Sequence, residues 1–441
     1  MADVRPFRGL RYNPDRVSDL GDVLCPPYDV ISDEEQVRLY DASEWNAVRV
    51  ELTRAEDIGA GEDRYAAAAR WLARWREDGV LTRDERPTFY LVAHDFEQAG
   101  ARLTRTELVG AVRLEPLDSG SIRPHEDTRS GPKEDRLRLI GATETNISPV
   151  MLLYGDDREV AQVLAEAVAA IEPNVADLGN GERFRLWPIA EPAMVKRLQD
   201  ALTGQPLYVA DGHHRFETSV HYRDRRAVEE PTWGEDRAVN YVMAALISLS
   251  DPGLLCLPYP RLLKGLEADA LAAVRGRLDA DFNEVRHNAA WAPAVQVAEE
   301  ALAGLQAPDV VFEVWGLEPA MRSAFRLRGS RPLESLTGAG HSAAWASLGP
   351  AVFRELVLKP ALGIEEEEAE KRGLLAFSKD ATEAVHRVNT GECQLAILPR
   401  AVPMTAFKEV SDRGERLPPK STYFSPKLAT GLVFNPLEGK L

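Results

Sequence analysis

Hydrophobic positions recur along the chain with two different spacings, which predict strands in some stretches and helices in others. The segments TFYLVAHDFE (88–97) and LTRTELVGAVRLEPL (103–117) are rich in β-branched and aromatic residues and are typical of strands. By contrast, EDRYAAAARWLARWRED (62–78) has the spacing of a helix. Near the start, VLCPPYDVI (23–31) is expected to form a strand that two prolines interrupt.

Predicted strands and helices alternate through the middle of the chain. PVMLLYGD (149–156) and AVNYVMAALISLS (238–250) are predicted as buried strands, and residues 206–227 as a strand that turns into a helix. The passage from 121 to 149 is rich in Pro, Gly and charged residues. We therefore expect a long loop there, with at most one helical turn at its end.

The length of the chain predicts more than one domain. Its 441 residues are enough for two or three hydrophobic cores, and the part from about Leu266 onward has the pattern of a separate α/β block. We expect an α+β multi-domain protein with mixed sheets. The expected domains are an N-terminal α+β domain over 1–115, a central core over 116–265 and a C-terminal domain over 266–441.

Composition and charge exclude several classes of protein. No apolar run approaches the ~18 to 20 residues that span a bilayer, so no membrane partner is expected. The net charge of −17 opposes binding to a nucleic-acid backbone, although a locally positive pocket for a small anion remains possible. The first residues lack the pattern of a secretory signal, and three widely spaced cysteines form no disulfide framework. A cytoplasmic location is therefore expected.

The stretch DGHHR (211–215) is the first candidate for chemistry. It follows an apolar strand and begins a helix, and unpaired N–H groups at a helix N-terminus bind anions. Gly212 permits the turn, His213, His214 and Arg215 would add donors to phosphates, and Asp211 could hold Mg²⁺ or a hydroxyl group. The alternative is that Asp211 caps the helix and the histidines are surface groups. A zinc site is the weaker interpretation, because neighbouring histidines diverge on a helix.

A second candidate lies in the charged passage that begins at residue 121. Glu126 or His125 could act as a general base, while the cations Lys133 and Arg136 neutralise a transferring phosphoryl group. A solvated charged loop is the alternative. At the end of this passage Asn146 and Ser148 form either a substrate-facing turn or a plain Asx or Ser turn.

Two further stretches carry weaker signals. Tyr28 and Asp29 follow Pro27 and could face a cleft, although a rigid strand end explains the prolines equally well. Near the other end of the chain, Lys420-Ser421-Thr422 lacks the preceding glycines of a phosphate-binding P-loop.

Four separated motifs, in the same order, resemble the bacterial and archaeal family catalogued as domain of unknown function 1015. They are CPPYD (25–29), the passage from Pro124 to Arg136, DGHHR (211–215) and the stretch from KST (420–422) to TG (430–431). The resemblance runs almost from end to end. It does not by itself imply an activity.

The central motifs IRPHE (122–126) and DGHHR (211–215) also resemble those of free serine kinases, which share a fold with the ParB nucleotide-binding domain and sulfiredoxin. This resemblance implies a ParB/sulfiredoxin-like central core, Glu126 as catalytic base and Asp211 as its partner. It also implies that His213, His214 and Arg215 bind nucleotide phosphates. The two motifs lie further apart here than in those compact kinases, so residues 150–205 would be an insertion or a rearranged layer.

These observations lead to one main hypothesis about function and two alternatives. The main hypothesis is a phosphotransferase that uses Mg²⁺ and ATP or ADP and acts on a small hydroxylated amino acid, serine or phosphoserine. The first alternative is a ParB-like switch that binds or hydrolyses a nucleotide, and the second is a small-molecule phosphatase. The direction of transfer, the nucleotide base and the oligomeric state stay open.

Overall fold

The computed structural model describes residues 2–98, 100–117, 120–126, 131–230, 233–289, 293–306, 309–319 and 321–441. The chain divides into two compact units. The first unit comprises Met1–Leu254 and Pro426–Leu441, and the second comprises Leu255–Ser425. Within the described residues, no helix combines the length and the apolar character that a membrane crossing requires.

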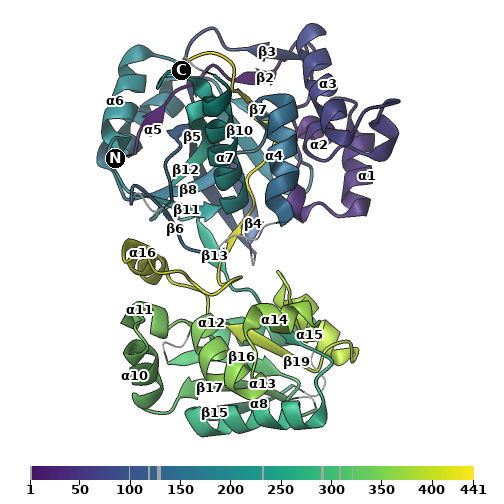
Figure 1. Cartoon of the computed structure of the whole chain (residues 1–441), viewed down its shortest axis with the longest axis vertical. Coiled ribbons are helices and arrows are strands. Elements are labelled where there is room, and N and C mark those ends of the chain that lie inside the picture. Colours follow the sequence, from purple (N-terminus) through teal and green to yellow (C-terminus); the bar gives the residue numbers. More distant parts are fainter. Residues whose placement is uncertain are drawn as a thin grey trace. The chain divides into compact units, whose positions relative to one another are not determined.

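A nine-stranded mixed sheet forms the centre of the first unit (Figure 1). Its strands lie in the order β6 (Ile122–Pro124), β11 (Leu207–Asp211), β8 (Val150–Tyr154), β12 (Tyr241–Ser248), β5 (Ala101–Arg113), β4 (Phe89–Gln98), β10 (Arg183–Ile189) and β9 (Asn174–Asp177), and β1 (Val4–Arg5) pairs with β5. The pairs β6–β11 and β8–β12 are parallel, and the other pairs are antiparallel. Segments 1–115 and 116–254 thus contribute strands to one sheet.

Side chains that alternate along the strands place the main core on one face of this sheet. Val150, Leu152 and Tyr154 of β8 share this core with alternate residues of β11 and β12. Helices α5 (Arg158–Ala170) and α6 (Pro192–Leu202) bury their apolar sides in it, and both begin at an acidic cap residue. Strand β12 is buried on both faces, as its continuous apolar run predicts.

A second core of the first unit is built from N-terminal helices and the C-terminal tail. It contains residues of α1 (Asp33–Ala42), α2 (Val48–Glu51), α3 (Arg64–Glu77) and α4 (Gly131–Thr143), together with Phe434. Strand β21 (Asn435–Pro436) of the tail pairs with β7 (Thr145–Asn146), and β2 (Leu10–Tyr12) pairs with β3 (Leu81–Arg83). Short 3₁₀ turns lie at Gly21–Val23, Tyr28–Val30, Ala55–Asp57 and Ala238–Asn240.

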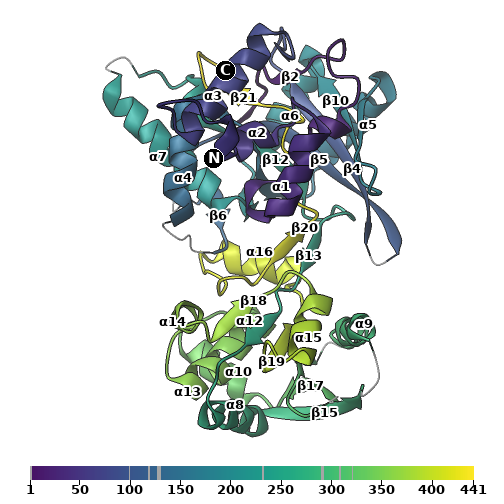
Figure 2. The ribbon, with the colours of Figure 1, turned by 90° about the vertical axis from the view of Figure 1, so that its right-hand side faces the viewer.

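The second unit has its own antiparallel sheet of six strands with helices on both faces (Figure 2). The order is β15 (Phe282–Asn288), β17 (Met321–Leu327), β16 (Val310–Trp315), β19 (Leu395–Pro399), β14 (Arg261–Leu263) and β18 (Leu375–Phe377), and β13 (Leu255–Leu257) pairs separately with β20 (Tyr423–Ser425). One face is covered by α8 (Ala268–Asp281), α12 (Gly349–Val352) and the π-helix Phe353–Leu358, and the other by α9 (Ala294–Gly304) and α15 (Ala381–Asn389). The remaining helices are α10 (Arg331–Gly338), α11 (Ala343–Ala346), α13 (Lys359–Leu362), α14 (Glu366–Lys371) and α16 (Met404–Asp412).

The predicted α+β class with a mixed sheet is confirmed, but two local predictions are wrong. Residues 121–149 do not form one long loop, because β6 and the helix α4 lie within them. Residues 23–31 contain the 3₁₀ turn Tyr28–Val30 and a single bridge from Cys25 to Thr430 in place of a strand. The residue that pairs with Cys25, Thr430, belongs to the C-terminal tail, and local sequence patterns do not reveal this contact.

Candidate functional site

The two motifs that carry the candidate chemistry leave the sheet at the same edge. Strands β6 and β11 are parallel neighbours, with Pro124 opposite Val209. His125 and Glu126 follow directly after β6, and Asp211 is the last residue of β11. Carboxyl ends of strands are where ligand sites form in α/β sheets. Residues 150–205, which lie between the two motifs, supply β8, β9 and β10 of the same sheet.

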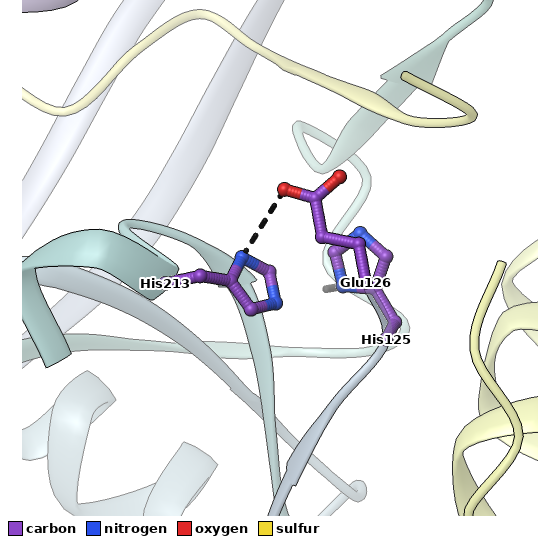
Figure 3. Close-up of side chains that lie close together, drawn as sticks. All are labelled: His125, Glu126 and His213. Atoms are coloured by element: carbon purple, nitrogen blue, oxygen red, sulfur yellow. Dashed lines mark ion pairs between the residues drawn. The ribbon is translucent and has the colours of Figure 1, made fainter. Parts of the chain in front are cut away.

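His125, Glu126 and His213 form one cluster at this edge (Figure 3). The Nδ1 atom of His125 lies 2.6 Å from the carbonyl oxygen of Val209, which requires Nδ1 to carry the proton. The Nδ1 atom of His213 lies 3.5 Å from Oε1 of Glu126, and the two imidazole rings meet edge to face at 4.7 Å. Both histidines are buried, whereas 30 % of the Glu126 side chain is exposed. Glu126 is therefore the member of the cluster that a ligand can reach.

Asp211 is held between two cations. Its Oδ2 atom accepts a hydrogen bond of 2.7 Å from Arg215, and its Oδ1 atom accepts one from Lys427 of the C-terminal tail. Burial raises the pKa of Asp211, but the charges of Lys427, Arg215 and His213 outweigh it and lower the pKa to about 2. Because each oxygen already faces a cation, this carboxylate fits a directly coordinated Mg²⁺ poorly.

Gly212 makes the turn from β11 into helix α7 (His213–Glu229). Its φ of 87° lies in the left-handed region, and a Cβ atom there would lie 3.1 Å from the guanidinium of Arg215. The first turn of α7 contains no acidic residue. His214, which is half-buried, comes second in this helix. The predicted strand, glycine turn and helix start are thus confirmed.

Arg215 is buried and bonds to protein groups. Besides Asp211, its guanidinium donates to the carbonyl of Pro149, at the start of β8. Arg215 therefore ties the end of β11 to the neighbouring strand. Arg215 contributes a positive charge to the candidate site, whereas its described N–H groups bond to Asp211 and Pro149.

A small cavity lies beside Arg215, and Glu51 is one of the residues that line it. Residues on its walls include Glu51, Arg136, Asn146, Ser148, Arg215 and Thr218. Glu51 is only 2 % exposed, although it carries a carboxylate. It accepts hydrogen bonds of 3.2 Å from Ser148 Oγ and 3.3 Å from the backbone N–H of Tyr28, and its Oε1 lies 3.4 Å from Arg136 Nη1. The cavity thus presents opposite charges close together.

The remaining predicted site residues have different surroundings. The Arg136 guanidinium lies over the Tyr28 ring at 4.0 Å. Burial raises the pKa of Tyr28 above its usual value, and the charges of Arg215 and Arg136 offset only part of this rise. Asp29 is exposed. The Oδ1 atom of Asn146 accepts from the backbone N–H of Met243 at 2.9 Å and from Asn435 at 3.1 Å, so its amide joins β7, β12 and β21.

Lys133 lies in the first turn of α4 and forms an ion pair with Glu217 of α7. This contact joins α4 to α7, the helix whose first residue, His213, belongs to the cluster. Arg136 likewise pairs with Asp135 of its own helix, with Nε 2.7 Å from Oδ2.

Comparison with known proteins assigns the chain to a family. A model of the family described as "Protein of unknown function (DUF1015)" matches residues 4–332. The chain belongs to the DUF1015 family. No protein with a curated description matches it.

Several solved structures resemble this DUF1015 chain at low sequence identity. A conserved hypothetical protein from Pyrococcus furiosus is 14 % identical, with 73 % of this chain and 92 % of that chain covered and a TM-score of 0.35. A free serine kinase in complex with AMP is 13 % identical, with coverage of 72 % and 86 % and a TM-score of 0.35. SbnI with a C-terminal truncation, from Staphylococcus aureus, is 12 % identical, with coverage of 74 % and 87 % and a TM-score of 0.35.

Two residues of the DUF1015 chain that matter at the site carry no local signal. Lys427 reaches Asp211 from the C-terminal tail, where it follows Ser425-Pro426 in a stretch with no recognisable phosphate-binding pattern. Glu51 ends the short helix α2, and its sequence context, VRVEL, resembles many half-buried segments. Only its burial beside Arg136 and Ser148 marks it as unusual.

Proposed function

We propose that the chain is a nucleotide-dependent phosphotransferase that acts on the hydroxyl group of a small amino acid, in the first instance free serine or phosphoserine. One observation carries the proposal: the partly exposed carboxylate of Glu126 lies beside the first residue of α7, where an anion would bind. The motifs around Glu126 and Asp211 resemble those of free serine kinases, which supports the same reaction class.

The N-terminus of α7 is the candidate site for the nucleotide phosphates. Its first backbone N–H groups have no partner within the helix, and the helix dipole favours negative charge there. Lys427 and Arg215 together carry two positive charges against the single negative charge of Asp211, so this group adds one net positive charge near the same helix end. His214, which is half-buried, is the candidate side-chain donor to the phosphates, whereas the buried His213 contacts Glu126. Mg²⁺ would arrive as the counter-ion of ATP or ADP, and we assign it no ligand on the chain.

Glu126 is the candidate general base. A serine hydroxyl is a weak nucleophile at neutral pH, and a carboxylate within hydrogen-bonding distance can take its proton as the oxygen attacks. In this step the new bond joins the serine oxygen to the terminal phosphorus of the nucleotide. The bond from that phosphorus to the leaving nucleotide oxygen breaks, and the hydroxyl proton passes to Glu126. His125 is the alternative base. Its hydrogen bond to the carbonyl oxygen of Val209 holds the ring in place, which favours a positioning role.

The cavity at Glu51 is the candidate site for the amino-acid part of the substrate. An α-amino acid carries one ammonium and one carboxylate group, and this cavity offers the carboxylate of Glu51 and the guanidinium of Arg136. Ser148 and Tyr28 adjoin Glu51, whereas Asp29 is an exposed neighbour of Tyr28. Arg215 contacts both this cavity and Asp211, so the two parts of the site are adjacent.

The experiment is to incubate the full chain with Mg²⁺, isotopically labelled serine and either ATP or ADP, and to measure labelled phosphoserine by mass spectrometry. The reverse reaction starts from phosphoserine with ADP or AMP. Phosphoserine formation that depends on the nucleotide would support the proposal. Nucleotide hydrolysis indifferent to serine would favour the switch, and loss of phosphate from phosphoserine without nucleotide would favour the phosphatase.

A further inference from the structure

The cluster His125, Glu126 and His213 has the geometry of a metal site that the phosphotransferase proposal does not use. One candidate ligand atom from each residue can be chosen so that all three lie within 4.8 Å of one another. For His213 and Glu126, the facing atoms are Nδ1 and Oε1, 3.5 Å apart (Figure 3). An ion that contacts two ligands at about 2.0 to 2.2 Å holds their atoms no more than ~4.4 Å apart, so the 3.5 Å pair fits one ion, and an atom at the 4.8 Å limit would have to move closer on binding.

The hydrogen bond of His125 fixes the tautomer that a metal ligand requires. Its Nδ1 atom donates to the carbonyl oxygen of Val209 at 2.6 Å, which places the lone pair on Nε2. Histidines that bind metals commonly hold their ring in this way, with the other N–H on a backbone carbonyl or a carboxylate. The contact also fixes the orientation of the His125 ring against β11.

The donor set selects the class of metal. Two imidazoles and one carboxylate suit Zn²⁺ and its neighbours in the first transition series, whereas Mg²⁺ prefers oxygen ligands. The two histidines are 1 % and 3 % exposed, and Glu126 is the more exposed member. Three protein ligands would leave a fourth coordination position on the exposed side for water or a ligand.

His213 and His214 are neighbours in the sequence, but their side chains diverge on α7, which argues against a metal site made by these two residues. The structure supplies a different pair, since β6 brings His125 to His213 from a distant part of the chain. The site therefore joins the end of a strand to the start of a helix.

We propose that His125, Glu126 and His213 bind one divalent transition-metal ion of the Zn²⁺ class. The ion would coordinate the same carboxylate oxygens that the proposed reaction uses as a base. This consequence rests on the proposed function: Zn²⁺ would then inhibit phosphoserine formation by occupying Glu126. Metal binding itself does not depend on that activity.

The test is a titration of the full-length, untagged, chelator-treated chain with Co²⁺, whose absorption in the visible range reports its ligands. We expect one Co²⁺ per chain, displaced by Zn²⁺ but not by a large excess of Mg²⁺. Glu126→Gln and His213→Ala should each weaken binding at least tenfold. The matched control is His221→Ala, because His221 lies exposed on the same helix and outside the cluster.

The outcomes separate this inference from the proposed function. Absence of Co²⁺ absorption, or equal binding by the Glu126→Gln variant, would overturn the metal site whether or not phosphoserine is made. Glu126→Gln is the decisive variant, because Glu126 is partly exposed and its replacement should preserve the fold. The test therefore holds even if His213→Ala unfolds the chain. Specific Co²⁺ binding by a chain that makes no phosphoserine would support the metal site and overturn the phosphotransferase.

Discussion

Lys427 and Asp211 form an ion pair although they are 216 positions apart in the sequence. Asp211 ends the strand that leads into α7, and Lys427 belongs to the C-terminal tail that returns to the first unit. The side chain of Asp211 is 17 % exposed and that of Lys427 is 10 % exposed, so water screens the pair only partly. The tail is thus part of the candidate site as well as of the fold.

Replacement of Lys427 should cost both stability and activity. In Lys427→Met, Asp211 keeps Arg215 as its partner but loses the second cation, so we expect the free energy of unfolding to fall by about 1–3 kcal/mol. Chemical denaturation measures this change. Lys440→Met is the matched control, because Lys440 is an exposed lysine of the same tail. Equal stability of the two variants would contradict a structural role for the pair.

The lowered pKa of Asp211 predicts a loss of stability in acid. The pKa is about 2 in the folded chain and ~3.9 in an unfolded one, so its stabilising contribution is complete above about pH 4. That contribution is lost as the pH falls through about 2. We expect the difference in unfolding free energy between the wild type and Asp211→Asn to shrink over this interval. The exposed residue Asp200, paired with Lys196, supplies the control Asp200→Asn, for which the difference should stay near zero at every pH.

Glu126→Gln should remove turnover and preserve the fold. The substitution keeps the shape of the side chain but replaces the basic carboxylate with an amide too weakly basic to accept the proton, and we expect a rate loss of about 10²-fold or more. Because 30 % of the side chain is exposed, the melting temperature should change little. Single-turnover assays of phosphoserine provide the measurement. If Glu126→Gln stays fully active while His125→Ala is inactive, His125 is the base.

Glu51→Gln should impair use of the amino acid more than use of the nucleotide. Glu51 lies in the cavity beside Arg136 and Ser148, and the change removes its charge while it keeps its size. We expect KM for serine to rise about tenfold or more and KM for the nucleotide to change little. The control is Glu56→Gln, in a glutamate whose side chain is 60 % exposed. An equal effect on both substrates would argue against a separate amino-acid cavity.

Gly212→Ala should destabilise the turn into α7 for two reasons. An alanine at a φ of 87° is strained, and its Cβ would lie 3.1 Å from the Arg215 guanidinium. Gly179→Ala isolates the first effect, because Gly179 has a φ of 70° with no atom within 4 Å of the added Cβ. We expect Gly212→Ala to lower the unfolding free energy by more than Gly179→Ala does. Thermal or denaturant unfolding of both variants provides the comparison.

Local patterns in the sequence were sufficient to predict much of the fold. The apolar runs at 88–97 and 238–250 form β4 and β12, and the spacing at 62–78 forms α3, because strand and helix periods are read within a single segment. The strand, glycine and helix start around Asp211 also follow from neighbouring residues alone. The same local rules failed at 121–149, where the charged residues and glycines suggested a loop. The segment instead contains α4, which packs against α3 and α7.

The sequence by itself determined which residues are candidates for chemistry, and only the tertiary structure decided which of them meet. Glu126 and Asp211 are recognisable from their motifs, but their shared edge depends on the parallel pairing of β6 with β11. Lys427 reaches Asp211, and Glu51 reaches Arg136, through contacts between distant segments. Such contacts arise when separate elements bury their apolar faces together, and a burial of this kind leaves no periodic signal near either partner.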